Sequence, residues 1–262
     1  MKNFISFVIF FSLPLILPTR GSAQQPDSLK AQHFVGLQLG INQVKEENLH
    51  PKASGGILAQ FSYGFENQNK NLERFDVVLG YSRLKTELED LSKTVNLRFR
   101  TAYSLNFKCV ENKKFIYHLG PEAVLDYNAS FYPNWDDSHL YWADYLSVGV
   151  NNIMTVPISG NRQWVTTIAI PLFSVFSRPE IYRLYKIDET DAGGIISNLN
   201  SNIDAAHLTN VFHLRLLTEY RFPAFRNGHE ALSYSFEWIK VKSDGGFPFQ
   251  KLVHQLGIKF FL

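Results

Sequence analysis

A short stretch near the middle of the chain carries the residue types used in general acid–base chemistry. Residues 134–139 read Asn-Trp-Asp-Asp-Ser-His, which brings Asp136, Asp137 and His139 close together in sequence. Carboxylates and imidazoles can activate water as general bases. The same residue types are common on solvated loops, and no nucleophile or metal-binding motif accompanies them here. We therefore keep these three residues as weak catalytic candidates, and we expect no metal site and no cofactor.

A second set of charged or titratable residues alternates with large apolar side chains along the chain. Its members are Arg74, Asp76, Arg98, Arg100, His118, Glu122, Asp126, Arg215, Glu219, Arg221, Glu237 and Lys259. If these side chains share an enclosed space, we expect them to form ion pairs, because unpaired charges in a dry interior are costly. The set favours a salt-bridge network that plugs the space. A path for ions or solutes is the alternative.

The alternation itself is the main structural signal, and residues 95–107 illustrate it. Val95, Leu97 and Phe99 begin one face, whereas Arg98 and Arg100 lie on the other. This run exceeds the roughly 5–6 residues that are typical of strands in soluble proteins. A tilted strand that crosses a bilayer needs about 9–11 residues. The pattern therefore predicts a membrane-crossing β-strand.

The same period-two pattern recurs in ten segments. They cover residues 32–42, 57–66, 74–82, 94–107, 115–128, 140–158, 162–174, 209–222, 231–241 and 256–262. The apolar faces are bulky and rich in aromatic residues, and the opposite faces are small or charged even in mid-strand. A barrel with lipid outside and a polar lumen inside explains both faces. A soluble lipocalin-like barrel is the alternative, because periodicity alone does not identify the buried face.

These segments predict an all-β fold, an antiparallel transmembrane up-and-down barrel of about ten strands. The count rises to twelve if segment 140–158 or the longest connection contains a further pair. The expected connections alternate between a longer set and a shorter set. The longer set is 43–54, 83–93, 129–139, 177–207 and 242–249, and the shorter set is 67–71, 108–113, 159–161 and 223–229. Long extracellular loops and short periplasmic turns follow this pattern. We expect connection 177–207 to cover the barrel mouth or to contact a partner.

The first 23 residues have the features of a cleaved export signal. Lys2 is followed by an apolar run over residues 4–17, and Gly21-Ser22-Ala23 supplies small residues before a cleavage point. The apolar run is shorter than the roughly 20 residues of a spanning helix. We therefore predict a signal peptide over residues 1–23 and a barrel domain over residues 24–262.

Composition excludes two other classes of protein. The net charge is +2, and no basic stripe is visible, so nucleic acid is not an expected partner. One cysteine, Cys109, rules out a disulfide within the chain.

Charged residues make up 19% of the chain, below the roughly 25% of soluble domains. Aromatic residues make up 15%, which suits strands and membrane-interface belts.

The export signal and the final segment together resemble those of bacterial outer-membrane β-barrel proteins, of the kind found in Bacteroidota. Leu256, Ile258, Phe260 and Leu262 alternate up to the end of the chain. In that family such a pattern, ending in an aromatic residue, is an assembly signal. The resemblance implies an outer-membrane location, and it implies contact with lipid, lipopolysaccharide and the barrel-assembly machinery. The final residue is Leu262, with Phe261 before it, which departs from the strict terminal-Phe form.

A function follows less directly than the architecture. Side chains fill barrels of about eight strands, whereas porins have about sixteen. We therefore expect a non-enzymatic structural or accessory subunit, with other outer-membrane proteins as partners. A narrow porin-like pore or transporter is the alternative. A surface hydrolase that uses Asp136, Asp137 and His139 is third, since these acids resemble the rim of omptin proteases in residue type only.

Overall fold

A computed structural model of the protein describes most of the expected barrel. The described residues are 31–47, 52–85, 94–132, 139–158, 161–178, 193–194, 203–207, 210–223, 229–242 and 248–262. The predicted signal peptide lies outside them and stays a prediction. Among these residues, no helix has the length and apolarity needed to cross a membrane.

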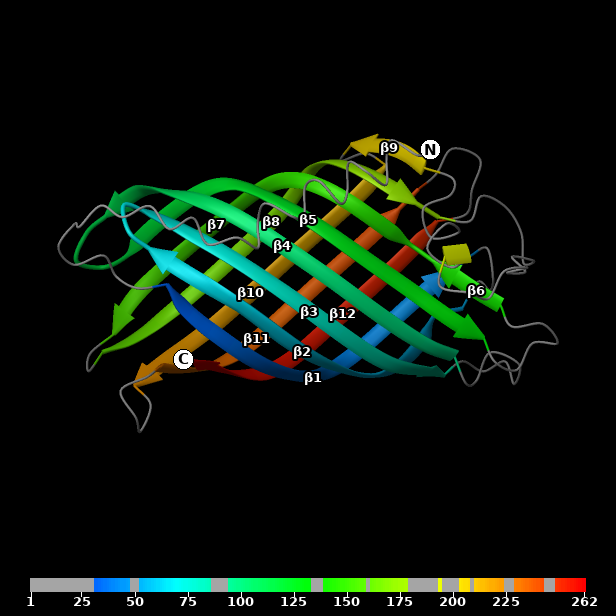
Figure 1. Ribbon diagram of the computed structural model, residues 1–262, viewed down its shortest axis with the longest axis horizontal. Coiled ribbons are helices and arrows are strands. Elements are labelled where there is room, and N and C mark those ends of the chain that lie inside the picture. The colour runs from blue at the N-terminus through cyan, green and yellow to red at the C-terminus, as the bar shows by residue number, and fades with distance from the viewer. Residues whose placement is uncertain are drawn as a thin grey trace.

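Ten long antiparallel strands form one closed barrel (Figure 1), which confirms the predicted fold class and strand number. They are β1 (Gln32–Glu46), β2 (Ser54–Gln68), β3 (Asn71–Lys85), β4 (Thr94–Glu111), β5 (Ile116–Tyr132), β7 (Asp144–Ile158), β8 (Arg162–Ser177), β10 (Val211–Pro223), β11 (His229–Val241) and β12 (Phe249–Phe261). Pairing of β1 with β12 closes the barrel, with Phe34 opposite Phe261. Two short strands, β6 (His139–Trp142) and β9 (Ile203–His207), extend the wall beside β5 and β8.

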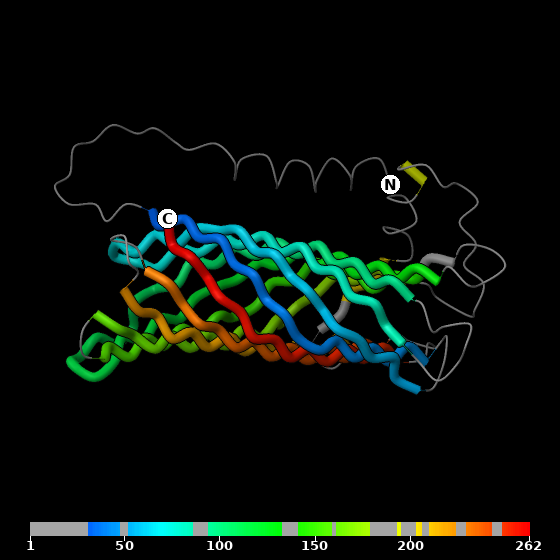
Figure 2. The backbone as a smooth tube through the Cα atoms, turned by 90° about the horizontal axis from the view of Figure 1, so that it is seen from below, coloured from blue at the N-terminus to red at the C-terminus, as the bar shows by residue number. Residues whose placement is uncertain are grey.

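The barrel has two distinct ends, which Figure 2 shows in side view. We call the end where β1 begins and β12 finishes the terminal end, and the opposite one the loop end. The connections at the terminal end are residues 69–70, 112–115, 159–161 and 224–228. Those at the loop end include residues 47–53, 86–93 and 242–248 and the segment from Arg178 to Asn210, which contains β9. The predicted alternation of short and long connections is therefore confirmed.

The outer face of the barrel is apolar and the inner face is polar. Leu39, Ile57 and Leu256 are 64%, 74% and 69% exposed on the outside. Asn42 and Asp126, on the inside, are fully buried. A soluble barrel would have the reverse arrangement, so the lipocalin-like alternative does not fit.

Aromatic side chains pair on the outer face near both ends of the barrel. Trp164 and Tyr220 lie 5.7 Å apart between ring centroids toward the terminal end. Phe212 and Trp238 lie 5.1 Å apart toward the loop end. Bands of this kind suit the two interfaces of a bilayer, where amphipathic rings are favourable.

Segment 140–158 keeps its predicted phase across a break at Ala143, because the two strands that result, β6 and β7, pair with β5 in one continuous register. Trp142 lies on the predicted outer side of the wall but is fully buried there. Its Nε1–H donates a hydrogen bond of 3.1 Å to the hydroxyl of Ser177. The indole thereby has the polar partner that a buried Trp usually needs.

Strand β8 contains one extra residue where it pairs with β7. Gly149 lies opposite Pro171 and Val148 lies opposite Phe173, so Leu172 is left over as a bulge. Proline cannot donate a ladder hydrogen bond and is tolerated at such positions. Leu172 and Phe173 are consequently both exposed on the outside.

Candidate functional site: the interior of the barrel

The interior near the terminal end is filled by five charged side chains, the terminal-end cluster. It consists of Glu66, Arg74, Glu219, Arg221 and Lys259. Arg221 donates from Nη1 to Glu66 at 2.8 Å and from Nη2 to Glu219 at 2.5 Å. Arg74 donates from Nε to Glu66 at 2.8 Å, and Lys259 binds Glu219. Since Glu66 is on β2 and Arg221 on β10, these bonds join walls on different sides of the lumen.

Two aromatic rings close this cluster toward the terminal end. The guanidinium of Arg221 lies 4.8 Å from the ring centroid of Phe261, and the ammonium of Lys259 lies 4.5 Å from that of Phe34. Cation–π contacts of this kind contribute about 0.5–2 kcal/mol, more when they are desolvated. The paired rings therefore cover the charges on the side that faces the terminal end.

Farther toward the loop end, Arg98 is the centre of a second group, the central cluster. Its Nε donates to Asp126 at 3.0 Å and its Nη1 to Glu237 at 2.5 Å. Strands β4 and β11, which carry Arg98 and Glu237, lie five positions apart around the ten-stranded ring. Tyr145 donates to Asp126 at 2.8 Å, and His213 Nε2 lies 2.7 Å from Glu237. The cluster therefore spans the full width of the lumen.

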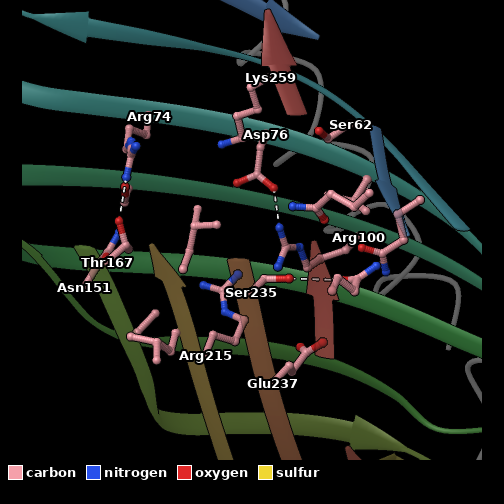
Figure 3. Close-up of a pocket in the computed structure, with 18 of the residues that line it drawn as sticks. Ser62, Arg74, Asp76, Arg100, Asn151, Thr167, Arg215, Ser235, Glu237 and Lys259 are labelled. Atoms are coloured by element: carbon pink, nitrogen blue, oxygen red, sulfur yellow. Dashed lines mark hydrogen bonds and ion pairs between the residues drawn. The ribbon is translucent and has the colours of Figure 1, made fainter. Parts of the chain in front are cut away.

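Between the two clusters lies a cavity of about 110 Å³. Asp76 binds Arg100 at 2.5 Å, and Glu122 binds Arg215. Figure 3 shows Asp76, Arg100 and Arg215 projecting into the same space from different strands. A buried water needs roughly 10–15 Å³ of such volume, so the cavity has room for several waters.

An apolar layer crosses the interior at the loop end. It consists of Val44, Leu84, Ala143, Tyr145, Phe176, Val211, Ile239, Val241 and Phe249. Beside it, Arg178 donates to Glu46 at 2.6 Å and to the hydroxyl of Tyr141 at 2.8 Å. Burial lowers the pKa of Arg178, but the charge of Glu46 and the phenol of Tyr141 raise it more, so the net shift is upward. Apolar side chains therefore occupy the lumen at the loop end, where an open pore would need a water-filled path.

Eleven of the twelve predicted interior residues enter these clusters or the cavity pairs, and His118 does not. His118 is 1% exposed, and neither of its ring nitrogens has a hydrogen-bond partner. The prediction placed it on the correct face of β5, but no described carboxylate hydrogen-bonds to its ring.

Sequence reasoning missed several polar residues of the interior, among them Glu46, Arg178, His213 and Lys251. His213 was visible as an inward position of the segment 209–222. Glu46 and Lys251 lie in parts of β1 and β12 that extend beyond the predicted segments. Lys251 Nζ binds the side-chain carbonyl of Asn128. Arg178 directly follows β8, within a predicted connection, where period-two alternation gives no signal.

The weak catalytic candidates remain untested. Asp136 and Asp137 lie outside the described residues, and His139 is described only as the first residue of β6. Within the described part of the chain, no group of three His, Cys, Asp or Glu side chains is placed to hold a metal ion. Most of the connection 177–207 also lies outside the described residues, so its role at the barrel mouth stays a prediction.

The predicted assembly signal covers the half of β12 nearer the terminal end and the residue that follows the strand. Leu256, Phe260 and Leu262 are exposed on the outside of the barrel. Ile258 lies on the same face of β12, half-buried. The four side chains therefore share one outward face, as the alternation predicted.

Comparisons with known proteins identify the fold and not a function. No family model matches the chain. No curated protein matches it either. Among solved structures, the outer membrane protease OmpT from Escherichia coli is similar with a TM-score of 0.51 and 8% identity, over 94% of this chain and all of OmpT. The β domain of the Bordetella autotransporter BrkA gives 0.42 with 8% identity, over 87% of this chain and 99% of the other.

Neisserial surface protein A is also similar, with a TM-score of 0.36 and 8% identity, over 88% of this chain and 98% of the other. The fold assignment rests on the likeness to OmpT together with the closed topology and the polarity of the two faces. The chain therefore has the fold of the bacterial outer-membrane β-barrels.

Proposed function

We propose that the protein resides in the outer membrane as a closed barrel and acts there as a structural or accessory subunit. The observation that carries this proposal is the filled lumen. Two clusters of paired charges and an apolar layer follow one another along the axis, and only about 110 Å³ stays open between the clusters. With little room for solute inside, the outer wall and the loop end are the surfaces left for function.

The proposal includes orientation and partners. The short connections face the periplasm and the long ones face the cell exterior, as in other barrels of this fold. The outer wall contacts lipid and lipopolysaccharide, and the loop end contacts other outer-membrane proteins. A tagged protein purified from native membranes in mild detergent is expected to bring down one partner in near-equal amount. Recovery of the barrel alone would contradict the accessory role.

A conductance measurement separates this function from the alternative of a narrow pore. In planar lipid bilayers, we expect the purified barrel to give no resolved current steps, because the ion pairs cross the lumen. A general porin inserted under the same conditions serves as the positive control. Single-channel steps of constant size from the barrel, in a number that rises with the amount of protein added, would instead favour a pore.

The final strand gives a separate prediction about assembly. Phe260, on the outer face of β12, is 39% exposed. We expect Phe260→Ser to lower the amount of folded protein in the outer membrane severalfold and to leave refolding in detergent nearly unchanged. Heat-modifiable migration in gels measures both quantities. Phe212→Ser, another outward aromatic change but on β10, is the control and should accumulate normally. Equal loss in both variants would mean that β12 carries no special signal.

A further inference from the structure

Five arginines of the described strands project inward, and they differ in how fully their N–H groups are used. A guanidinium offers five N–H donors. Arg98 uses Nε, Nη1 and Nη2 on Asp126 and Glu237. Arg221 uses all three nitrogens on two glutamates, and Arg74 uses all three on Glu66 and Thr167. Every guanidinium nitrogen of these three arginines therefore donates at least one hydrogen bond to the protein.

Arg100 and Arg215 are not saturated. Arg100 donates one hydrogen bond, from Nη2 to Asp76, and Arg215 donates one, from Nη2 to Glu122. The Nε–H of each is buried without a partner. Leaving a buried donor unpaired costs about 1–3 kcal/mol, and more for a charged group. Both residues line the cavity, and the Nη1 group of each, which donates no hydrogen bond and keeps accessible surface, is the donor left for a ligand there.

The rest of the cavity lining also has more unpaired donors than unpaired acceptors. The amide nitrogens of Gln60 and Gln255 are buried and unpartnered, and so is the hydroxyl of Ser62. In the same lining, the carbonyl oxygen of Asn151 is an unpartnered acceptor. An amide can be turned so that its oxygen and nitrogen exchange places, but a guanidinium carries only donors and keeps its protons. The donor excess at Arg100 and Arg215 therefore holds whichever way the amides are oriented.

The charges of the cavity lining sum to a small positive excess. The lining holds five cationic side chains and four carboxylates, namely Arg74, Arg98, Arg100, Arg215 and Lys259 against Glu66, Asp76, Glu122 and Glu237. Arg74 and Arg98 donate from all three of their nitrogens to the protein, so the unused donors are concentrated on Arg100 and Arg215.

Glycines on the facing wall provide the space. A Cβ at Gly36 would collide with the hydroxyl of Ser62, and one at Gly80 would lie 3.3 Å from Nε2 of Gln60. A side chain at either position would press on the polar lining. The strands β1 and β3 thus keep the wall open where Gln60 and Ser62 of β2 reach inward.

We propose that this cavity binds one small monovalent anion, of halide size, between the guanidinium groups of Arg100 and Arg215. The anion accepts hydrogen bonds that the protein leaves unmade, and its charge offsets the local positive excess. It also joins β4 to β10 across the lumen. This binding is independent of the proposed accessory role, since a closed barrel can hold an anion inside whether or not its outer surface binds a partner protein.

Diffraction with bromide tests the site directly. The full barrel is crystallised from detergent in sodium bromide, and data are collected at the bromine absorption edge. We expect an anomalous peak in the cavity beside Arg100 and Arg215. Absence of a peak there, at bromide concentrations that label other sites on the surface, would overturn the proposal. Conductance plays no part in this readout, so its result does not depend on the function proposed above.

Thermal unfolding in detergent provides the second readout. At equal ionic strength, the midpoint should be higher in chloride than in gluconate, which is too large for the cavity. A ligand that binds only the folded state raises stability by RT ln(1 + [L]/Kd), where [L] is the free ligand concentration. Arg100→Gln combined with Arg215→Gln should abolish the difference between the two salts. Arg83→Gln, an exposed arginine on the outer face of β3, should retain it. An equal chloride effect in both variants would contradict the proposal.

Discussion

Replacing Arg98 with methionine is expected to lower the free energy of unfolding by about 3–5 kcal/mol, because two carboxylates then lose their common partner. Arg98 is 5% exposed and binds Asp126 and Glu237 at once. Asp126 is fully buried and Glu237 is only 6% exposed, so solvent cannot fully replace the guanidinium. Urea unfolding of the barrel in lipid vesicles, followed by tryptophan fluorescence, measures the loss.

Two further variants make this experiment specific. Arg83→Met removes an exposed arginine from the same barrel and should change stability by no more than about 0.5 kcal/mol. The triple change Arg98→Met, Asp126→Asn and Glu237→Gln removes the charges together and should recover much of the loss, since no lone charge remains buried. If Arg98→Met behaved like Arg83→Met, the central cluster would have no role in stability.

Placing an arginine on the outer wall at mid-strand should be nearly as damaging. Leu39 lies at the middle of β1, opposite Leu256 and Ala59, and is 64% exposed. In a membrane barrel, Leu39→Arg is expected to cost about 2–4 kcal/mol, because the charge lies at the bilayer midplane. The measurement is again urea unfolding in lipid vesicles.

A position nearer the membrane interface provides the control for this second prediction. Ile158 is also exposed but lies at the terminal end of β7. Ile158→Arg should cost only about 0–1 kcal/mol, since the side chain reaches the interface. On a protein surrounded by water, both changes would fall within about 0.5 kcal/mol. Equal and small effects at the two sites would therefore rule out a membrane environment for this wall.

The period-two pattern was sufficient to assign the charged interior residues to their face. Because side chains alternate strictly along a strand, the amino-acid sequence alone placed Arg98 and Glu122 inside. The pattern could not say that Arg98 would meet Glu237. That pairing depends on the tilt and stagger of the strands around the barrel, which no single segment encodes.

The boundaries of the polar interior were harder to predict for a physical reason. Toward the loop end the inward side chains become apolar, as at Val44 and Phe249. A rule that places polar residues inside and apolar residues outside fails there, so the segments predicted for β1 and β12 fell short of the loop end. Glu46 and Lys251 were missed as a result. Arg178 was missed because it follows the last residue of β8, where alternation stops.

The ion pairs of the interior also constrain how the chain reaches its final state. Arg221 and Glu66 are 155 residues apart in sequence, and Arg98 and Glu237 are 139 residues apart. Contacts of such separation form late, because the intervening chain must first be ordered. Until β12 meets β1, these charges lack their partners across the lumen and have only those on the same or adjacent strands. Closure of the wall and full neutralisation of the interior are therefore expected to occur together.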